Sequence, residues 1–387
     1  MADEVRERMV VILGAGASYD CVPSTIDRST LIDSKALVPI SALPLDEVRP
    51  PLTQHLAESR TLTNWAAARW QWARPVVSHL RGVLRTAPGH DDYRTVLSLE
   101  EALRSFEGRS ESISDRRRQM LAMRFYLRDL FKVCTDYMYS PELTGGVTNH
   151  VQLLNAVLEW CGNGRRREAA VISFNYDLIL ERAVASVIIF DPLNFDHYLH
   201  HPRLKVLKPH GSIIWHYAVA PTTVQTSHGS PVALGEQCIN TVVSNFGFSV
   251  EDLVATEVPV SDEVIEQKHQ LLPALAIPTT GKTEFVWPAE QRNYLVSLRG
   301  DVTRLLTIGW RGLEPDFLPL LKPLVRPDGR VLVVCGGDRG EAEAEETVSR
   351  LQKTLTTVGP RRWSKYGGGF AEFIEGRSGE YGDFFLR

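Results

Sequence analysis

Residues 9–18 read MVVILGAGAS, and this stretch decides the fold. Residues 9–13 are continuously apolar and rich in β-branched side chains, as in a strand that is buried on both faces of a parallel sheet. The turn Gly14-Ala15-Gly16-Ala17-Ser18 follows at once. Small residues let the backbone approach a phosphate, and its amides can then donate to the phosphate oxygens. A strand that runs into such a turn is typical of the start of a nucleotide-binding α/β fold.

Further strands of the same kind follow along the chain, with helical stretches between several of them. They are predicted at residues 169–174, 204–208, 304–308 and 330–334. Strands that alternate with helices predict a Rossmann-like parallel sheet with helices on both faces.

The pattern also predicts how the chain is divided. We expect a sheet domain made of residues 1–50 and 163–345, a mostly helical module inserted at 51–162, and a C-terminal tail at 346–387. Residues 21–50 contain four prolines and are predicted to be irregular, and residues 221–270 are predicted to be a loop-rich excursion of the sheet domain. The tail is expected to pack against the domain or to take part in oligomerisation.

Composition excludes several classes of protein. A chain of 387 residues with a net charge of -4 suits a large domain plus a second module, and it argues against direct nucleic-acid binding. Its five cysteines form no CxxC pair, so we expect no zinc and no other metal, and free thiols suit a cytoplasmic location. The N-terminus has no apolar signal core, and no run of about 18 apolar residues predicts a membrane span.

Polar residues follow two of the predicted strands directly. Asn175 and Asp177 come after residues 169–174, and His210 comes after residues 204–208. Ligands of parallel sheets lie beyond the carboxyl ends of the strands. The Asn175 amide can donate and accept, so it could orient a water or a ribose hydroxyl; the alternative is a helix N-cap. His210 is a candidate general base, with a structural histidine as the alternative.

Glycine turns follow the last two predicted strands. These are Gly309-Trp310 and Gly336-Gly337-Asp338. An acidic residue beyond a strand end can hold the ribose hydroxyls of a dinucleotide, although each segment could also be a plain turn. Because all these strand ends fall on one edge of one predicted sheet, together they predict a dinucleotide site.

The order GAGAS, FNYD and KPHGS resembles that of sirtuins, and most of all the sirtuin-like domains of prokaryotic anti-phage defence systems. The resemblance covers roughly residues 1–60 and 165–340. It implies that Gly14 to Ser18 hold the NAD pyrophosphate, and that Asn175 and Asp177 lie beside the nicotinamide ribose. It makes His210 the catalytic base or the partner of a ribose hydroxyl. It assigns the adenosine half to Gly309, Trp310, Gly336, Gly337 and Asp338.

The chain also departs from the deacetylases of this family. It lacks their zinc module, and residues 19–23 read YDCVP in place of a Pro-Asp-Phe-Arg segment. Water is therefore the expected acceptor, and we expect an NAD hydrolase that releases nicotinamide and ADP-ribose. The alternatives are an NAD-dependent deacylase and a non-catalytic NAD-binding scaffold for a partner ATPase. A dehydrogenase is disfavoured because Tyr19 breaks the GxGxxG spacing.

The resemblance further implies how the activity is used. Unregulated NAD hydrolysis would kill the host cell, so we expect a gated, homo-oligomeric effector that depletes NAD in anti-phage defence and abortive infection. The sensing partner would be a hexameric motor ATPase or a short Argonaute, with no membrane partner.

Overall fold

A six-stranded parallel sheet forms the centre of the computed structural model, in the order β11-β10-β9-β1-β2-β3. The structure describes residues 7–21, 66–84, 106, 112–139, 146–163, 166–219, 227–244, 253–258, 265–267, 270–277, 285–337, 339–376 and 379–385. The strands are β1 (Glu7–Leu13), β2 (Arg167–Ser173), β3 (Leu204–Leu207), β9 (Val302–Ile308), β10 (Val325–Val334) and β11 (Trp363–Tyr366). The predicted parallel α/β fold is therefore confirmed, as are all five of its predicted strands.

The strand order fixes where a ligand can bind. Starting from β1, the chain adds β2 and then β3 on one side, and later adds β9, β10 and β11 on the other. This is the 3-2-1-4-5-6 order of dinucleotide-binding folds, whose ligands bind where the order reverses. In this sheet the reversal lies between β1 and β9, which pair in parallel.

Helices cover both faces of the sheet, and the strands explain why. Alternate side chains of a strand point to opposite faces. Met9, Val11 and Leu13 accordingly join one apolar core, whereas Val10 and Ile12 join the other. The first core is covered by α7 (Asn149–Gly162), α8 (Ile179–Val187), α9 (His197–His200), α14 (Gly369–Ile374) and α15 (Gly379–Phe385). The second is covered by α11 (Ala289–Ser297), α12 (Leu318–Leu321) and α13 (Gly340–Thr354).

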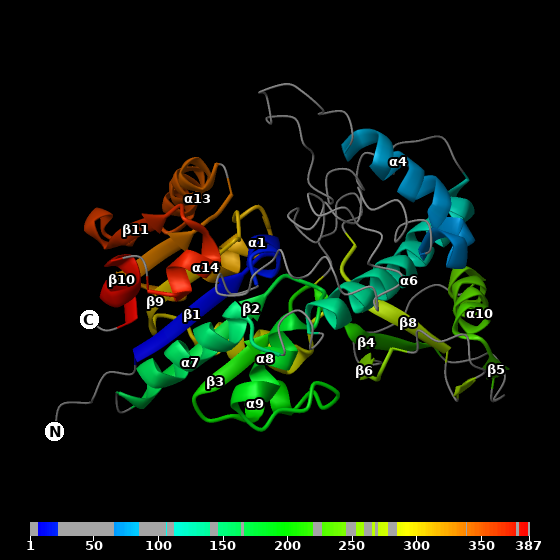
Figure 1. The fold of residues 1–387 in the computed structure, drawn as a ribbon, viewed down its shortest axis with the longest axis horizontal. Helices are drawn as coiled ribbons and strands as arrows, with labels where there is room; N and C mark the ends of the chain where they lie inside the picture. Colours follow the sequence, from blue (N-terminus) through cyan, green and yellow to red (C-terminus); the bar gives the residue numbers. More distant parts are fainter. Residues whose placement is uncertain are drawn as a thin grey trace, which may run out of the picture.

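A second, antiparallel sheet lies beside the first, in the order β6-β4-β8 (Figure 1). Its strands are β4 (Gly211–Val219), β6 (Leu253–Ala255) and β8 (Gln270–Leu275), and a separate pair is formed by β5 (Ser227–Gly229) and β7 (Ile265–Gln267). The long helix α6 (Ile113–Met138) runs along this sheet and contacts α10 (Pro231–Ser244), and the same lobe contains η3 (Gln71–Ala73) and α4 (Arg74–Leu84) (Figure 1).

Several elements were not predicted from the sequence: the strands β4 to β8, helix α10 and strand β11. Helix α10 lies within residues 221–270, where we expected loops. Its buried residues Leu234, Cys238 and Val242 recur at helical spacing, but the polar residues around the helix conceal that period. Strand β11 lies in the predicted tail; it is only four residues long and none of its side chains is fully buried.

Some predictions concern segments that the structure does not describe. Of the predicted irregular stretch 21–50, only Cys21 is among the described residues. Of residues 51–162, the described part contains η3, α4, α6 and the whole of α7, and the predicted domain boundaries stay predictions. No described helix combines the length and the apolar character needed to cross a membrane.

Candidate functional site

The glycine turns after β1 and β9 interlock where the strand order reverses. The Gly14 amide donates to the Ile308 carbonyl at 3.0 Å, and the Gly16 amide donates to the Gly309 carbonyl at 3.3 Å. Helix α1 (Ala15–Tyr19) starts from this contact, with Ala15 exposed. In the structure, the glycines are therefore needed for close contact between two backbones. The amides of Gly14, Gly16 and Ala17, all in the predicted phosphate turn, are already bonded to protein.

We expect Gly309→Ala to lower the free energy of unfolding by at least about 2 kcal/mol. A Cβ at this position would lie 2.5 Å from the Ala17 nitrogen and from the Gly16 Cα, and the backbone is left-handed at φ +59°. Urea unfolding measures the change. The matched control is Gly300→Ala, at φ +74° with nothing within 4 Å, which should cost only about 1–2 kcal/mol. Equal losses in the two variants would show that the contact with Gly16 contributes nothing.

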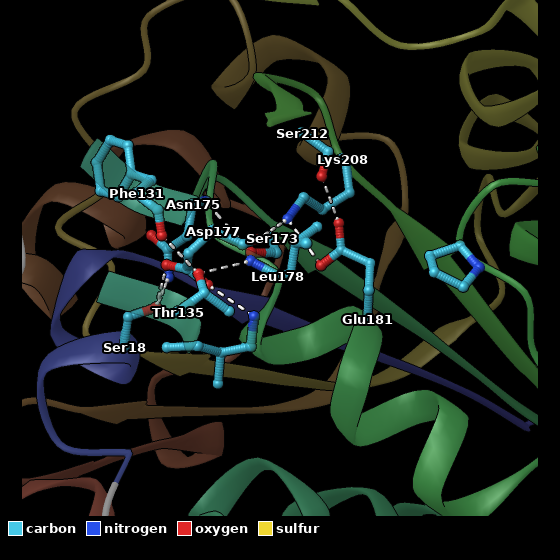
Figure 2. A network of polar contacts seen from close by, with 12 residues as sticks. Ser18, Phe131, Thr135, Ser173, Asn175, Asp177, Leu178, Glu181, Lys208 and Ser212 are labelled. Carbon is cyan, nitrogen blue, oxygen red and sulfur yellow. Dashed lines mark hydrogen bonds and ion pairs between the residues drawn. The ribbon is translucent and has the colours of Figure 1, made fainter. Parts of the chain in front are cut away.

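A polar triad, made of Ser18, Asn175 and Asp177, follows the ends of β1 and β2. The Asn175 side-chain nitrogen donates to the Gly14 carbonyl at 2.9 Å and to the Ser18 hydroxyl at 2.7 Å. That hydroxyl donates to an Asp177 carboxylate oxygen at 2.7 Å (Figure 2). These bonds bring together four of the residues that the sequence assigned to one site, namely Gly14, Ser18, Asn175 and Asp177.

The helix-cap interpretation of Asn175 is not what the structure shows. The N-cap of α8 is Leu178, and it is Asp177 that accepts from the Ile179 amide at 3.1 Å. Both donor bonds of the Asn175 side chain fix its orientation, and both use its nitrogen, so that no hydrogen bond between described residues involves its oxygen Oδ1. Asn175 therefore has a fixed amide with an acceptor oxygen available to a ligand.

A buried ion pair lies behind the triad. Lys208 and Glu181 are both fully buried, with the ammonium nitrogen 3.0 Å from the carboxylate. The ammonium also donates to the Asp177 carbonyl at 2.8 Å, and Ser212 donates to Glu181 at 2.7 Å (Figure 2). Burial raises the pKa of Glu181, and the charge of Lys208 opposes that rise. No role was predicted for these three residues; the available signal was a glutamate on the apolar face of α8.

His210 lies among aromatic rings at the end of β3. Its ring centroid is 4.8 Å from that of Phe174, 6.0 Å from that of Tyr176 and 6.4 Å from that of Phe285. Burial lowers the pKa of His210 from 6.5 to about 4, although a hydrogen bond to the main chain of Phe174 opposes this shift. The imidazole is therefore neutral at physiological pH. No hydrogen bond between described atoms joins His210 to Asn175.

The remaining predicted site residues are placed differently. Trp310 is buried and its ring stacks on Phe174 at 5.7 Å, so it belongs to the apolar core as well as to the β9 turn. A Cβ on Gly336 would lie 2.8 Å from the Gly369 Cα, which shows that the turns after β10 and β11 also pack closely. Gly337 is exposed at φ +81°, and Asp338 lies outside the described residues.

Stability should fall on acidification because two histidines are buried in the neutral form. Burial lowers the pKa of both His150 and His216 from 6.5 to about 3, with help from the charges of Lys208 and Arg128 respectively. Between pH 6.5 and 3 the unfolded chain binds more protons than the folded chain, so stability is complete above pH 6.5 and is lost as the pH falls. We expect up to about 1.4 kcal/mol per pH unit from each histidine.

Urea unfolding at pH 7, 6 and 5 measures this loss. His216→Gln cannot take up a proton and should flatten the slope by the contribution of one histidine. The raised pKa of Glu181 has the opposite effect, since it favours the folded protein as the pH falls. This effect is the same in the wild type and in the His216→Gln variant. A slope that is unchanged in the variant would contradict the assignment to His216.

No group of three or more His, Cys, Asp or Glu side chains in the described part of the chain could hold a metal ion. Among the cysteines whose side chains are described, Cys161, Cys238 and Cys335 are free thiols, and all three are buried, as is Cys21.

Comparison with known proteins gives a likeness to solved structures alone. No model of a known family matches the chain, and no curated protein matches it. A structure described as Sir2Tm bound to a propionylated peptide has 16% identity and a TM-score of 0.34, and the match covers 99% of this chain and 95% of that chain. A complex described as Sir2, p53 peptide and NAD+ has 15% identity and a TM-score of 0.34, with 97% and 93% covered. Likeness at this level does not identify a function.

Proposed function

We propose that this chain binds NAD at the carboxyl edge of its parallel sheet and hydrolyses the nicotinamide–ribose bond, releasing nicotinamide and ADP-ribose. The observation that carries the proposal is the strand order. It brings the turns after β1 and β9 together where the order reverses. Asn175 follows β2, the strand next to β1, and His210 follows β3, the strand next to β2. A crevice at such a reversal is where α/β sheets bind dinucleotides.

Asn175 is suited to hold the water or the ribose. When nicotinamide leaves, the ribose carbon gains positive charge and needs a nucleophile close by. The Asn175 amide is held through its nitrogen by Gly14 and Ser18, so its free oxygen has a fixed direction. A fixed acceptor can orient a water without reorganising during the reaction.

His210 is suited to accept a hydrogen bond from a ribose hydroxyl. Its pKa of about 4 makes it a weak base at pH 7, since efficient general bases have pKa values near the working pH. A neutral imidazole still offers an acceptor nitrogen. Between the two roles that the sequence left open, we therefore favour the hydroxyl partner over the proton-abstracting base.

We also propose that the reaction is gated, because uncontrolled loss of NAD would be lethal to the cell that makes the protein. The gate would be a homo-oligomer together with a sensing partner such as a hexameric motor ATPase, acting in the cytoplasm during anti-phage defence. Slow turnover by the purified chain, accelerated by such a partner, is the expected behaviour. Full activity of a dilute monomer would contradict the gate.

The test incubates concentrated purified protein with NAD for several hours and follows nicotinamide and ADP-ribose by chromatography. Parallel samples contain an acetyl-lysine peptide. We expect ADP-ribose in the absence of peptide. Nicotinamide release that requires the peptide and yields an O-acylated product would establish the deacylase instead. Bound NAD without turnover in either sample would contradict hydrolysis by the chain alone, and addition of the candidate partner would then separate a gated hydrolase from a non-catalytic scaffold.

A further inference from the structure

His210 is flanked by two residues that bind the same buried carboxylate. Lys208 stands two positions before it and Ser212 two positions after it. The Lys208 ammonium lies 3.0 Å from one oxygen of Glu181, and the Ser212 hydroxyl donates to the other oxygen at 2.7 Å (Figure 2). Glu181 therefore holds both sides of the segment that carries the histidine.

The same group of side chains reaches the Asn175 segment. Glu181 belongs to α8, the helix that begins two residues after Asp177. The Lys208 ammonium also donates to the Asp177 carbonyl at 2.8 Å, and the Asp177 carboxylate accepts from Ser18 at 2.7 Å. A continuous chain of hydrogen bonds thus runs from the segment around His210 to the turn that fixes Asn175.

Backbone bonds make this segment rigid at the same place. The Gly211 amide donates to the Lys208 carbonyl at 3.0 Å and closes the turn around His210. The Lys208 amide donates to Gln291 at 3.0 Å. With its side chain and backbone both bonded, Lys208 has a fixed position, and it transmits the position of Glu181 to His210.

Stability alone does not account for a fully buried ion pair here. Removing two charges from water costs several kcal/mol for each ion, and replacing a buried pair by apolar side chains of similar size is often neutral or stabilising. A matched apolar pair would fill the same volume but would not hold the His210 segment at a fixed position relative to the Asp177 segment. We therefore explain the ion pair of Glu181 and Lys208 by the geometry that it imposes on these segments.

We propose that Glu181 and Lys208 are positioning residues that set His210 relative to Asn175. The proposal rests on the proposed function, because it gives the pair a role in the same reaction. Neither residue contacts the reacting atoms in this view. Their effect passes through the histidine segment and through the main chain of Asp177.

The experiment compares the wild-type protein with the double variant Glu181→Leu/Lys208→Met, which keeps the volume and removes both charges. We expect its denaturation midpoint to stay close to that of the wild type. Its kcat for NAD should fall by about 10²-fold with a KM changed by less than threefold, since a displacement of about 1 Å can have that effect. The matched control is Glu7→Leu/Arg167→Met, an ion pair at the opposite edge of the same sheet, where kcat should not change.

A readout without turnover separates this inference from the proposed function. The imidazole signals of His210, assigned by comparison with His210→Gln, are recorded by NMR at pH 7 in each protein. We expect them to shift or broaden in the Glu181/Lys208 variant and to stay unchanged in the control, even if the wild type does not hydrolyse NAD. Should the double variant fail to fold, Ser212→Ala removes one hydrogen bond and no charge, and it should cause the same changes to a smaller extent. Unchanged His210 signals with an unchanged kcat would overturn the proposal.

Discussion

Replacement of Asp129 by Asn is expected to lower the free energy of unfolding by roughly 3–5 kcal/mol. Asp129 on α6 is completely buried. One carboxylate oxygen accepts two bonds from the Arg128 guanidinium at 2.9 and 2.7 Å, and the other accepts from Arg69 at 3.2 Å and from the Trp70 indole at 2.9 Å. The substitution removes the negative charge that both guanidinium groups face and turns an amide donor toward other donors. Urea unfolding followed by circular dichroism measures the loss.

The same helix offers a matched control. Asp136, two turns further along α6, pairs with Lys132 and Arg182, but its side chain is 45% exposed. Exposed ion pairs contribute about 0–1 kcal/mol because water and salt screen them. Asp136→Asn should therefore cost less than about 1 kcal/mol. If the two variants lost the same amount, burial would not be what makes Asp129 important.

The parallel sheet could be predicted because its strands carry their signal locally. Residues 9–13 are all buried in the structure, and strands buried on both faces appear in the sequence as continuous apolar runs. The antiparallel sheet gave no such signal. Strand β6 is only three residues long and none of its side chains is fully buried, so its place depends on pairing with β4, more than thirty residues away in the sequence. Pairing of that kind is decided by tertiary contacts.

The location of the site could be predicted from the sequence, but most of the hydrogen bonds and backbone contacts within it could not. Asn175, Ser18 and Gly14 meet because β1 and β2 are adjacent. This contact could be anticipated, since both strands were predicted to be parallel and to end in turn residues. The contact between Gly14 and Gly309 could not be anticipated, because GxG alone does not distinguish a phosphate turn from close backbone packing. The bond between Glu181 and Lys208 joins a helix to a strand end, and its formation depends on how α8 packs against the sheet.

The pH dependence of turnover should separate the two roles of His210. Because the pKa of His210 is lowered to about 4, the ring stays neutral as the pH falls from 8 to 5. Catalysis that needs the neutral imidazole should then keep its kcat/KM over that range and lose it only as the pH approaches about 4. A histidine with an ordinary pKa would lose activity below about pH 6.5. A measured acid limb near 6.5 that disappears in His210→Gln would contradict the lowered pKa and the neutral ring.

Removal of either functional side chain should have the largest effect on turnover. We expect Asn175→Ala and His210→Ala each to lower kcat for NAD by about 10²–10⁴-fold, the range seen when a positioned acid, base or acceptor is lost. The two controls are Asn194→Ala and His200→Ala, which remove the same side chains at exposed positions away from the triad and should leave kcat within about twofold. Asn175 also holds Gly14 and Ser18, so part of its effect would come from a displaced β1 turn, and that part should appear as a higher KM. His210 makes no such bonds to the turn, so its loss should lower kcat with little change in KM. Normal hydrolysis of NAD by both the Asn175→Ala and the His210→Ala variants would contradict the roles proposed for these two residues.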